Sequence, residues 1–383
     1  MNDYMIYEDS IMFRPEFDKS LDNYIEVIKN YKKIIFSNYD DLEICIRVNN
    51  KFKYNKQYTQ SNFNQPLENS LLNLTNLTNL TFGCYFNLPL ENSLLNLTNL
   101  AHLTFGHDFN QPLENSLSSL TNLTHLTFGD DFNQPFANSL STLINLTNLT
   151  FAYHFNKPLE NSLSTLTNLT HLTFGGDFNL PLENSLSTLT NLTHLTFGDS
   201  FNLPLENSSL NLINLTHLTI GYKFNKLLDD LPYSLKYLTL GDKFNELLNN
   251  LPNLLLYLML GNNFNQPIEN LPNSLTHLIF GNNFNQPVDN LPNSLTHLIF
   301  DIWRGIFNQP IKNLPNSITN IILSKRFNES LDNLPDSIES ISLHSNYNLK
   351  INKFPKNLKN IRCSENYEFM DDLTNKYKIE YFY

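Results

Sequence analysis

The chain has 383 residues, of which 41% are hydrophobic, so it holds enough apolar material for a sizeable core. Its formal charge is −12 at pH 7, from 25 lysines and arginines against 37 aspartates and glutamates. This acidic balance argues against a nucleic-acid partner and against an anionic membrane surface, because both require a basic face.

Residues 1–16 start with an acidic run and carry the apolar side chains Ile6, Ile11, Met12 and Phe13. They lack the basic region and apolar run of a signal peptide, and the chain has no stretch of about 18 apolar residues. We therefore expect a cytoplasmic protein without a membrane span, and we interpret residues 1–16 as an N-terminal cap.

Residues 17–62 resemble sequence found much later in the chain. Phe17–Asn23 aligns with Phe327–Asn333, and Ile34–Ser37 aligns with Ile321–Ser324. The steps from Phe17 to Tyr39 and from Tyr39 to Phe63 are 22 and 24 residues. We interpret the segment as two degenerate copies of the unit that follows.

From residue 63 onward a Phe-Asn pair recurs at a fixed step. The step is 23 residues at first, then mainly 20, with one step of 23 at Phe307. The anchors are Phe63, Phe86, Phe109, Phe132, Phe155, Phe178, Phe201, Phe224, Phe244, Phe264, Phe284, Phe307, Phe327 and Tyr347. A period of this length predicts one supersecondary unit stacked on copies of itself, which is a repeat solenoid. Residues 63–223 would form seven longer repeats and residues 224–366 mainly shorter ones, followed by a C-terminal cap at 367–383.

Each unit contains one short apolar stretch with period-two alternation, such as Leu192–Phe197, in which Leu195 and Phe197 would point inward. The glycine that follows, here Gly198, suggests a turn with positive φ. In the longer units the outer arm could form a single helical turn. In the shorter units a proline, such as Pro272, predicts an extended or 3₁₀ arm. The fold is therefore expected to be leucine-rich-repeat-like, with one parallel strand per turn.

Two columns of side chains follow from this stacking. The Phe of each pair should form the core. The Asn of each pair, such as Asn110 and Asn133, should form an asparagine ladder that satisfies backbone groups in its own and the neighbouring turn.

The first outward position of the strand defines the candidate partner-binding surface. It is occupied by His102, His125, His171, His194, His217, Tyr237, Tyr257, His277 and His297, and Thr dominates the second outward position. Three interpretations stay open: a solvated surface copied by duplication, a protein-recognition face, and a metal site. The last is disfavoured because the strand pattern places no Cys, Asp or Glu beside the histidines.

Trp303 and Arg304 interrupt the rhythm within an insertion at 301–306. They are either a binding hot spot or part of a tolerated loop. The three cysteines, Cys45, Cys84 and Cys363, are far apart and form no CxxC pair, so no metal or cofactor is expected.

The motif FN-x-P-[LI]-[ED]-N, together with LxxLxFG, resembles the FNIP-repeat family of amoebal and giant-virus proteins, over about residues 63–366. The resemblance implies a leucine-rich-repeat-like solenoid and a role in protein recognition, in host-cell cytoplasm if the chain is viral. Some members carry an N-terminal F-box. Asp41–Phe52 is faintly similar to one, but the repeat alignment of 17–62 is the better match, so we expect no F-box.

Side chains that could do chemistry occur here as copies in equivalent settings, and no catalytic fingerprint is present. We expect a monomeric, non-enzymatic adaptor or scaffold that binds a protein through a concave face lined by His and Thr. The alternatives are a substrate receptor of an F-box-type ubiquitin ligase and a structural protein without a specific ligand.

Overall fold

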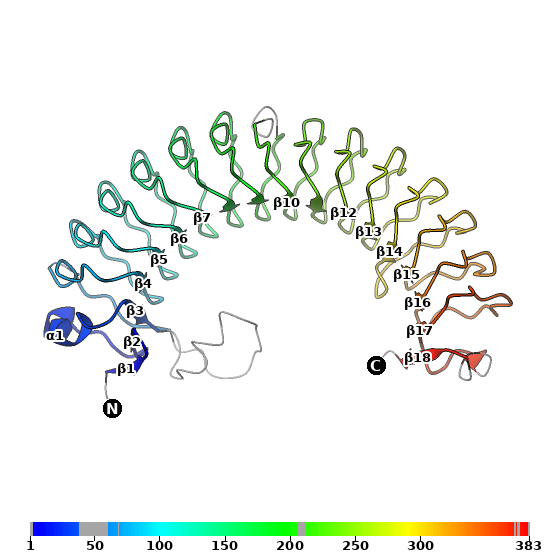
Figure 1. Cartoon of the computed structure of the whole chain (residues 1–383), viewed down its shortest axis with the longest axis horizontal. Coiled ribbons are helices and arrows are strands. Elements are labelled where there is room, and N and C mark those ends of the chain that lie inside the picture. The colour runs from blue at the N-terminus through cyan, green and yellow to red at the C-terminus, as the bar shows by residue number, and fades with distance from the viewer. Residues whose placement is uncertain are drawn as a thin grey trace. The chain divides into compact units, whose positions relative to one another are not determined.

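The computed structural model describes residues 3–37, 60–67, 69–205, 211–370, 373 and 376–381. The chain forms two compact units, Met1–Gly198 and Asp199–Tyr383, and each is described by itself. In both, successive turns contribute one strand each to a parallel sheet that lies on the inner side of the turns (Figure 1).

The first unit opens with an antiparallel hairpin of β1 and β2, and from β2 onward its strands are parallel. Two short helical segments lie between β2 and β3. The elements are β1 (Tyr4–Tyr7), β2 (Ser10–Phe13), the 3₁₀ helix η1 (Leu21–Tyr24), α1 (Ile25–Ile28), β3 (Lys33–Phe36), β4 (Asn79–Thr81), β5 (His102–Thr104), β6 (His125–Thr127), β7 (Asn148–Thr150), β8 (His171–Thr173) and β9 (His194–Thr196).

The second unit is parallel throughout its described strands, and β18 at its end continues the sheet from β17. Its strands are β10 (His217–Ile220), β11 (Tyr237–Leu240), β12 (Tyr257–Met259), β13 (His277–Phe280), β14 (His297–Phe300), β15 (Asn320–Ile322), β16 (Ser340–Ser342), β17 (Asn360–Cys363) and β18 (Lys378–Tyr381). The expected class, a parallel-strand solenoid with little helix, is confirmed.

The core is built from columns of identical side chains. In β4–β17 the second residue of each strand is buried, and so is the aromatic residue of each Phe-Asn pair from Phe63 to Phe327. Phe109 stacks on Phe86 and Phe132, the same residue one turn before and after, with ring centroids 6.0 and 6.1 Å apart. It also packs against Phe105 at 4.1 Å. The expectation that the Phe column forms the core is confirmed.

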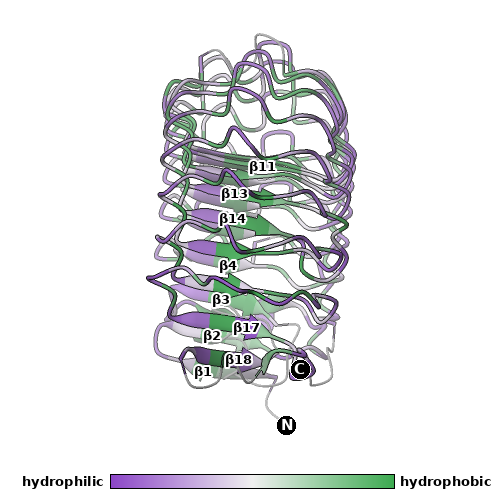
Figure 2. Ribbon diagram, turned by 90° about the vertical axis from the view of Figure 1, so that its right-hand side faces the viewer, coloured by the Kyte–Doolittle hydropathy of each residue, from purple (hydrophilic) through white to green (hydrophobic). Residues whose placement is uncertain are grey.

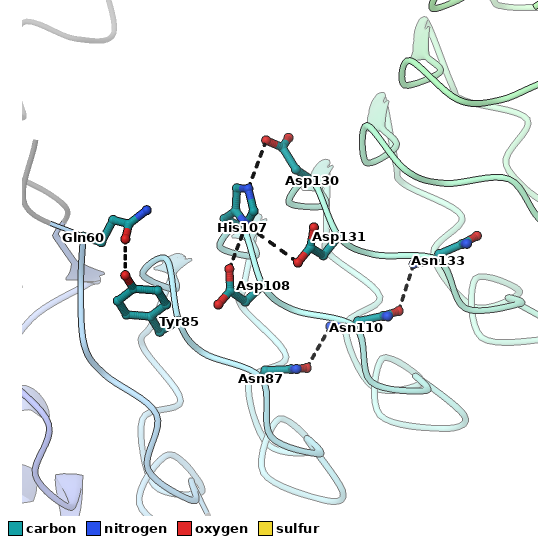
Figure 3. Close-up of polar contacts among 9 residues, drawn as sticks. All are labelled: Gln60, Tyr85, Asn87, His107, Asp108, Asn110, Asp130, Asp131 and Asn133. Carbon is teal, nitrogen blue, oxygen red and sulfur yellow. Dashed lines mark hydrogen bonds and ion pairs between the residues drawn. The ribbon is translucent and has the colours of Figure 1, made fainter. Parts of the chain in front are cut away.

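The asparagine ladder is also confirmed. The side-chain oxygen of Asn87 accepts a hydrogen bond from the backbone N–H of Asn110 at 2.9 Å, and Asn110 accepts one from Asn133 in the same way (Figure 3). The second unit repeats this, for example from Asn265 to the Asn245 side chain at 2.8 Å. Each turn is therefore hydrogen-bonded to the next through the same amide.

The glycine after the strand has a different role from the one predicted. None of the described glycines has a positive φ, so the expected left-handed turn is wrong. A Cβ on Gly106 would lie 1.7 Å from the carbonyl oxygen of Gly83, one turn earlier. Close packing of successive turns, rather than backbone conformation, selects glycine at this position.

The outer arms of the longer units are chains of turns rather than a helical turn. Their backbone hydrogen bonds span three residues, as from Ser116 N–H to Leu113 and from Leu120 N–H to Leu117, at 2.7 and 3.0 Å. A left-handed residue lies in the arm as well, for example Glu114 with φ 39°. Glu114 precedes residues 116–123, where the backbone hydrogen bonds span only two or three residues and form no regular helix.

Within 17–62, Phe17 and Leu21 are buried and β3 follows, at the positions that the repeat alignment gives them. β3 pairs directly with β4, so the sheet has no position for a further strand between them. The second degenerate copy and the F-box-like stretch Asp41–Phe52 fall largely or wholly on 38–59, outside the described residues. The division of the chain into caps and repeat blocks stays a prediction.

Candidate partner-binding surface

The nine His and Tyr residues singled out from the sequence form a column in each unit, which we call the aromatic ladder. Each is the first residue of its strand and lies in register with the same position in the next turn, as His102 with His125. In the first unit Asn148 lies between His125 and His171 and interrupts the column of rings. The members are His102, His125, His171 and His194 in the first unit, and His217, Tyr237, Tyr257, His277 and His297 in the second. They are half-buried or exposed, while the next residue in each strand is buried. β13 and β14 accordingly change from hydrophilic to hydrophobic along their length (Figure 2).

Neighbouring rings of the ladder stack face to face. The ring centroids are 4.3 Å apart for His102 and His125, and 4.3 Å for His171 and His194. In the second unit the distance is 4.3 Å for His217 and Tyr237, and 4.2 Å for His277 and His297. Tyr257 is tilted between its neighbours at 6.2 and 6.1 Å. Stacking at the strand repeat holds these rings in fixed orientations.

A threonine before most of the ladder histidines fixes their tautomer. The Thr124 hydroxyl lies 2.9 Å from the Ala101 carbonyl oxygen, one turn earlier, and 2.9 Å from His125 Nδ1. A hydroxyl has one hydrogen, and if it is donated to the carbonyl, Nδ1 must donate to the hydroxyl. The same pair of contacts occurs at Thr170, Thr193, Thr276 and Thr296. Nε2 then carries a lone pair and is the acceptor that the ring presents to a partner.

Three histidines of the ladder favour the neutral imidazole. Burial lowers the pKa of His102, His125 and His297, and the nearby His125, His171 and His277 respectively lower it further. Charging one ring of a stacked column is disfavoured because the ring loses water and meets a like charge. At these three positions the ladder therefore presents a neutral ring at neutral pH.

The second outward position differs between the two units. In the first unit it is threonine throughout, from Thr104 to Thr196. In the second unit Thr219 and Thr239 are followed by apolar residues, which are Met259, Ile279 and Ile299. Met259 is 39% exposed and the two isoleucines are half-buried. The expectation of a threonine-dominated face holds for the first unit only.

Trp303 and Arg304 do not join the ladder. They lie in the turn after β14, beyond the carboxyl end of the strand, whereas the ladder lies at the amino ends. Asp301 Oδ1 accepts hydrogen bonds from the backbone N–H groups of Trp303 and Arg304 at 2.9 and 2.5 Å. The indole is 55% exposed and meets His344 edge to face at 6.4 Å. The proposed site residues thus lie in two places. The ladder lies on the outward side of the strands, which we call the strand face, and Trp303 and Arg304 lie in the turn after a strand, which we call the turn edge.

Met259, Ile279 and Ile299 were not singled out from the sequence. Their signal was available, because each follows a ladder residue by two positions and must point to the same side of the strand. In the described part of the chain, no helix is long and apolar enough to cross a membrane.

Comparison with known proteins agrees with the repeat architecture. The FNIP Repeat family model matches residues 224–263, 264–301 and 307–346. Among solved structures the chain is similar to CroV588, a circular leucine-rich-repeat protein of the giant virus CroV. The sequence identity is 31% and the TM-score 0.58, over 94% of this chain and 67% of CroV588. No similar sequence was found among curated proteins.

More distant structures share the fold alone. LIC12759, a leucine-rich-repeat protein of Leptospira interrogans, is 18% identical with a TM-score of 0.54, over 90% of this chain and 100% of that one. TLR13, in its complex with ssRNA13, is 17% identical with a TM-score of 0.66, over 93% and 54%. The recurring Phe-Asn motif, the stacked parallel strands and the similarity to CroV588 together show that the chain belongs to the FNIP-repeat family, whose units build a leucine-rich-repeat-like solenoid.

Proposed function

We propose that the chain is a non-catalytic adaptor or scaffold that binds a protein partner through the strand face, and that the second unit supplies the central contacts. The observation that carries this proposal is the pairing of aromatic and aliphatic columns there. Tyr237 and Tyr257 lie beside Met259, Ile279 and Ile299 on one face, in register from strand to strand.

Such a surface has the composition of a protein interface. Tyr and Met are enriched in interface cores, while charged residues are depleted. Tyr237 and Met259 are each 39% exposed, so a partner that covers them removes apolar surface from water. The ladder histidines that contact a threonine hydroxyl through Nδ1 add hydrogen-bond acceptors at Nε2.

The face is also rigid before binding. Its side chains project from hydrogen-bonded strands, and the ladder rings are held by stacking and, where the Thr is present, by its hydroxyl. Little side-chain entropy is lost when a rigid surface binds, so a larger share of the contact energy contributes to affinity. Catalysis needs a set of distinct side chains, each with an environment suited to its role. This face instead repeats similar side chains from turn to turn.

The test compares two substitutions of exposed aliphatic residues in the same turn. Met259→Glu places a charge on the strand face, whereas Leu254→Glu places one five residues earlier, at a side chain that is 50% exposed but lies before the strand. Partners captured by the unmodified chain should be lost with Met259→Glu and retained with Leu254→Glu. Binding affinity of the identified partner, measured by calorimetry, should fall by at least about tenfold for Met259→Glu only.

Equal binding by both variants would contradict the proposal for this face. A second control is the triple variant in which Tyr237, Tyr257 and Met259 are all changed to Glu. If the unmodified chain captures no more protein than this variant, a structural protein without a specific ligand is favoured. The ubiquitin-ligase alternative requires residues 17–62 to dock the ligase core, and residues 38–59 of that segment lie outside the described part of the chain.

A further inference from the structure

A second cluster of side chains lies on the turn edge of the first unit, away from the aromatic ladder. Cys84, His107 and Asp108 each offer one possible metal-ligand atom, and these atoms all lie within 4.8 Å of one another. His107 is also close to two further carboxylates, with Nε2 3.7 Å from Asp130 and Nδ1 3.9 Å from Asp131 (Figure 3).

Repeat stacking brings these residues together. Cys84, His107 and Asp130 occupy the same position, directly after the glycine, in three successive turns, and Asp108 and Asp131 occupy the next position. Residues at equivalent positions lie about 4.8 Å apart in adjacent strands. Backbone hydrogen bonds hold the turns together here: Asp108 N–H donates to the Cys84 carbonyl and Asp131 N–H to the His107 carbonyl, both at 2.9 Å. Residues that are 23 apart in the sequence therefore lie as close together as the ligands of a short motif such as CxxC.

The donor set is not a cluster of acidic groups alone. It combines one thiol, one imidazole and carboxylates, and this mixture of sulfur, nitrogen and oxygen is the set that zinc prefers. Cys84 is 1% exposed and held in place by packing, while His107 and Asp108 lie nearer the surface and can turn. Tetrahedral zinc ligands lie about 3.3–3.6 Å apart, given bonds of about 2.0–2.3 Å. Zinc binding therefore requires His107 and Asp108 to rotate from their present positions, in which the three possible ligand atoms lie within 4.8 Å of one another.

We propose that Cys84, His107 and Asp108 bind a zinc ion that cross-links consecutive turns, with Asp130 or Asp131 as the fourth ligand. Binding releases the thiol proton to solvent, and the sulfur then coordinates as thiolate. The surrounding carboxylates, which disfavour the thiolate in the free protein, neutralise part of the charge of the cation instead.

The carboxylates around Cys84 attract a cation, although together with burial they disfavour the free thiolate. Burial is the main cause that raises the pKa of Cys84, and the charges of Asp108, Asp130 and Asp131 raise it further. A divalent cation reverses both effects, because it provides the opposite charge at bonding distance. Cys363 is a useful contrast, since burial alone raises the pKa of its thiol to about 11.

The experiment uses the full chain, kept reduced and stripped of metal, and adds Co²⁺ as a spectroscopic substitute for Zn²⁺. One equivalent of Co²⁺ should give a thiolate-to-cobalt charge-transfer band, and one equivalent of Zn²⁺ should abolish it. Cys84→Ser should remove the band, and Cys84→Ser and His107→Gln should each weaken zinc binding by more than about tenfold in competition with a chelator. Cys363→Ser and Cys45→Ser remove the other two cysteines and should leave the band intact.

Asp130→Asn and Asp131→Asn, tested separately, identify the fourth ligand as the one whose loss weakens binding. Circular dichroism of each metal-free variant checks that it is folded. Absence of the band in the unmodified chain would overturn the proposal. So would unchanged zinc affinity in folded Cys84→Ser, because the cation would then be held by surface carboxylates alone.

Discussion

The core residues of this chain pack mainly against residues at the same repeat position in the adjacent turns. Phe109 is fully buried between Phe86 and Phe132, which are the same residue in the turns on either side. A substitution therefore damages two interfaces at once, since the side chain fills space against the preceding and the following turn.

Phe109→Ala should lower the free energy of unfolding by about 3–5 kcal/mol, because it leaves a cavity in a fully buried stack. Urea denaturation followed by circular dichroism measures this. Ile144→Ala is the control: this side chain is 52% exposed, and its removal should change stability by about 0.5 kcal/mol or less. A small effect at Phe109 would mean that the ring is not part of a closely packed column.

At the scale of the strand, three residues do three separate tasks. The first carries the ladder, the second the core, and the third either threonine or an aliphatic side chain. Because the ladder residue is directly followed by the core residue, a change in the ladder affects the stability of the fold as well as binding. His102, His125 and His297 lose hydration on folding, so a proton bound to any of the three destabilises the folded state.

This coupling predicts the direction of the pH dependence. The pKa values of His102, His125 and His297 are lowered in the folded chain, so between those values and about 6.5 the unfolded chain binds more protons. Their contribution to stability is complete above about pH 6.5 and is lost as the pH falls toward the lowered values.

The urea midpoint should therefore fall between pH 7.5 and 5.5, and the fall should be smaller in the double variant His102→Asn/His125→Asn. Asn148 occupies the same column, so asparagine fits there. His154 is the opposite control. Its hydrogen bond to Asp177 raises its pKa, so it stabilises the folded chain at low pH, and His154→Asn should steepen the loss. If the urea midpoint depends on pH in the same way in the unmodified chain and in both variants, the ladder does not cause the pH dependence.

The strand, the Phe column and the asparagine ladder could be predicted from one unit, because each follows from period-two alternation and a fixed step. The role of Gly106 could not. Glycine is compatible with both positive φ and close packing, and only the 1.7 Å approach to Gly83 decides between them. The conformation of the outer arm was missed as well, since Ser, Thr and Leu are compatible with a helical turn and with successive tight turns.

At the scale of the whole chain, the sequence predicted which residues form columns but only part of what those columns do. Cys84 was dismissed because its nearest cysteine is 39 residues away, although the possible ligands beside it in space, His107 and Asp108, are 23 and 24 residues away. In a solenoid the relevant spacing is the repeat length. Motif searches at short spacing overlook ligand sets of this kind, and comparing equivalent positions in consecutive turns finds them.

Stacked turns also determine how far a perturbation spreads. The stability of a solenoid is close to a sum of turn and nearest-neighbour terms, so damage at one turn weakens its neighbours most. In Phe109→Ala, backbone amides of β4, β5 and β6 should exchange with deuterium faster than in the unmodified chain, at a denaturant concentration where both remain folded. Amides of β13 and β14 should keep their rates, because Phe109 stacks on Phe86 and Phe132, which lie many turns away from those strands along the chain. A uniform acceleration across all strands would show instead that the turns unfold together as one cooperative unit.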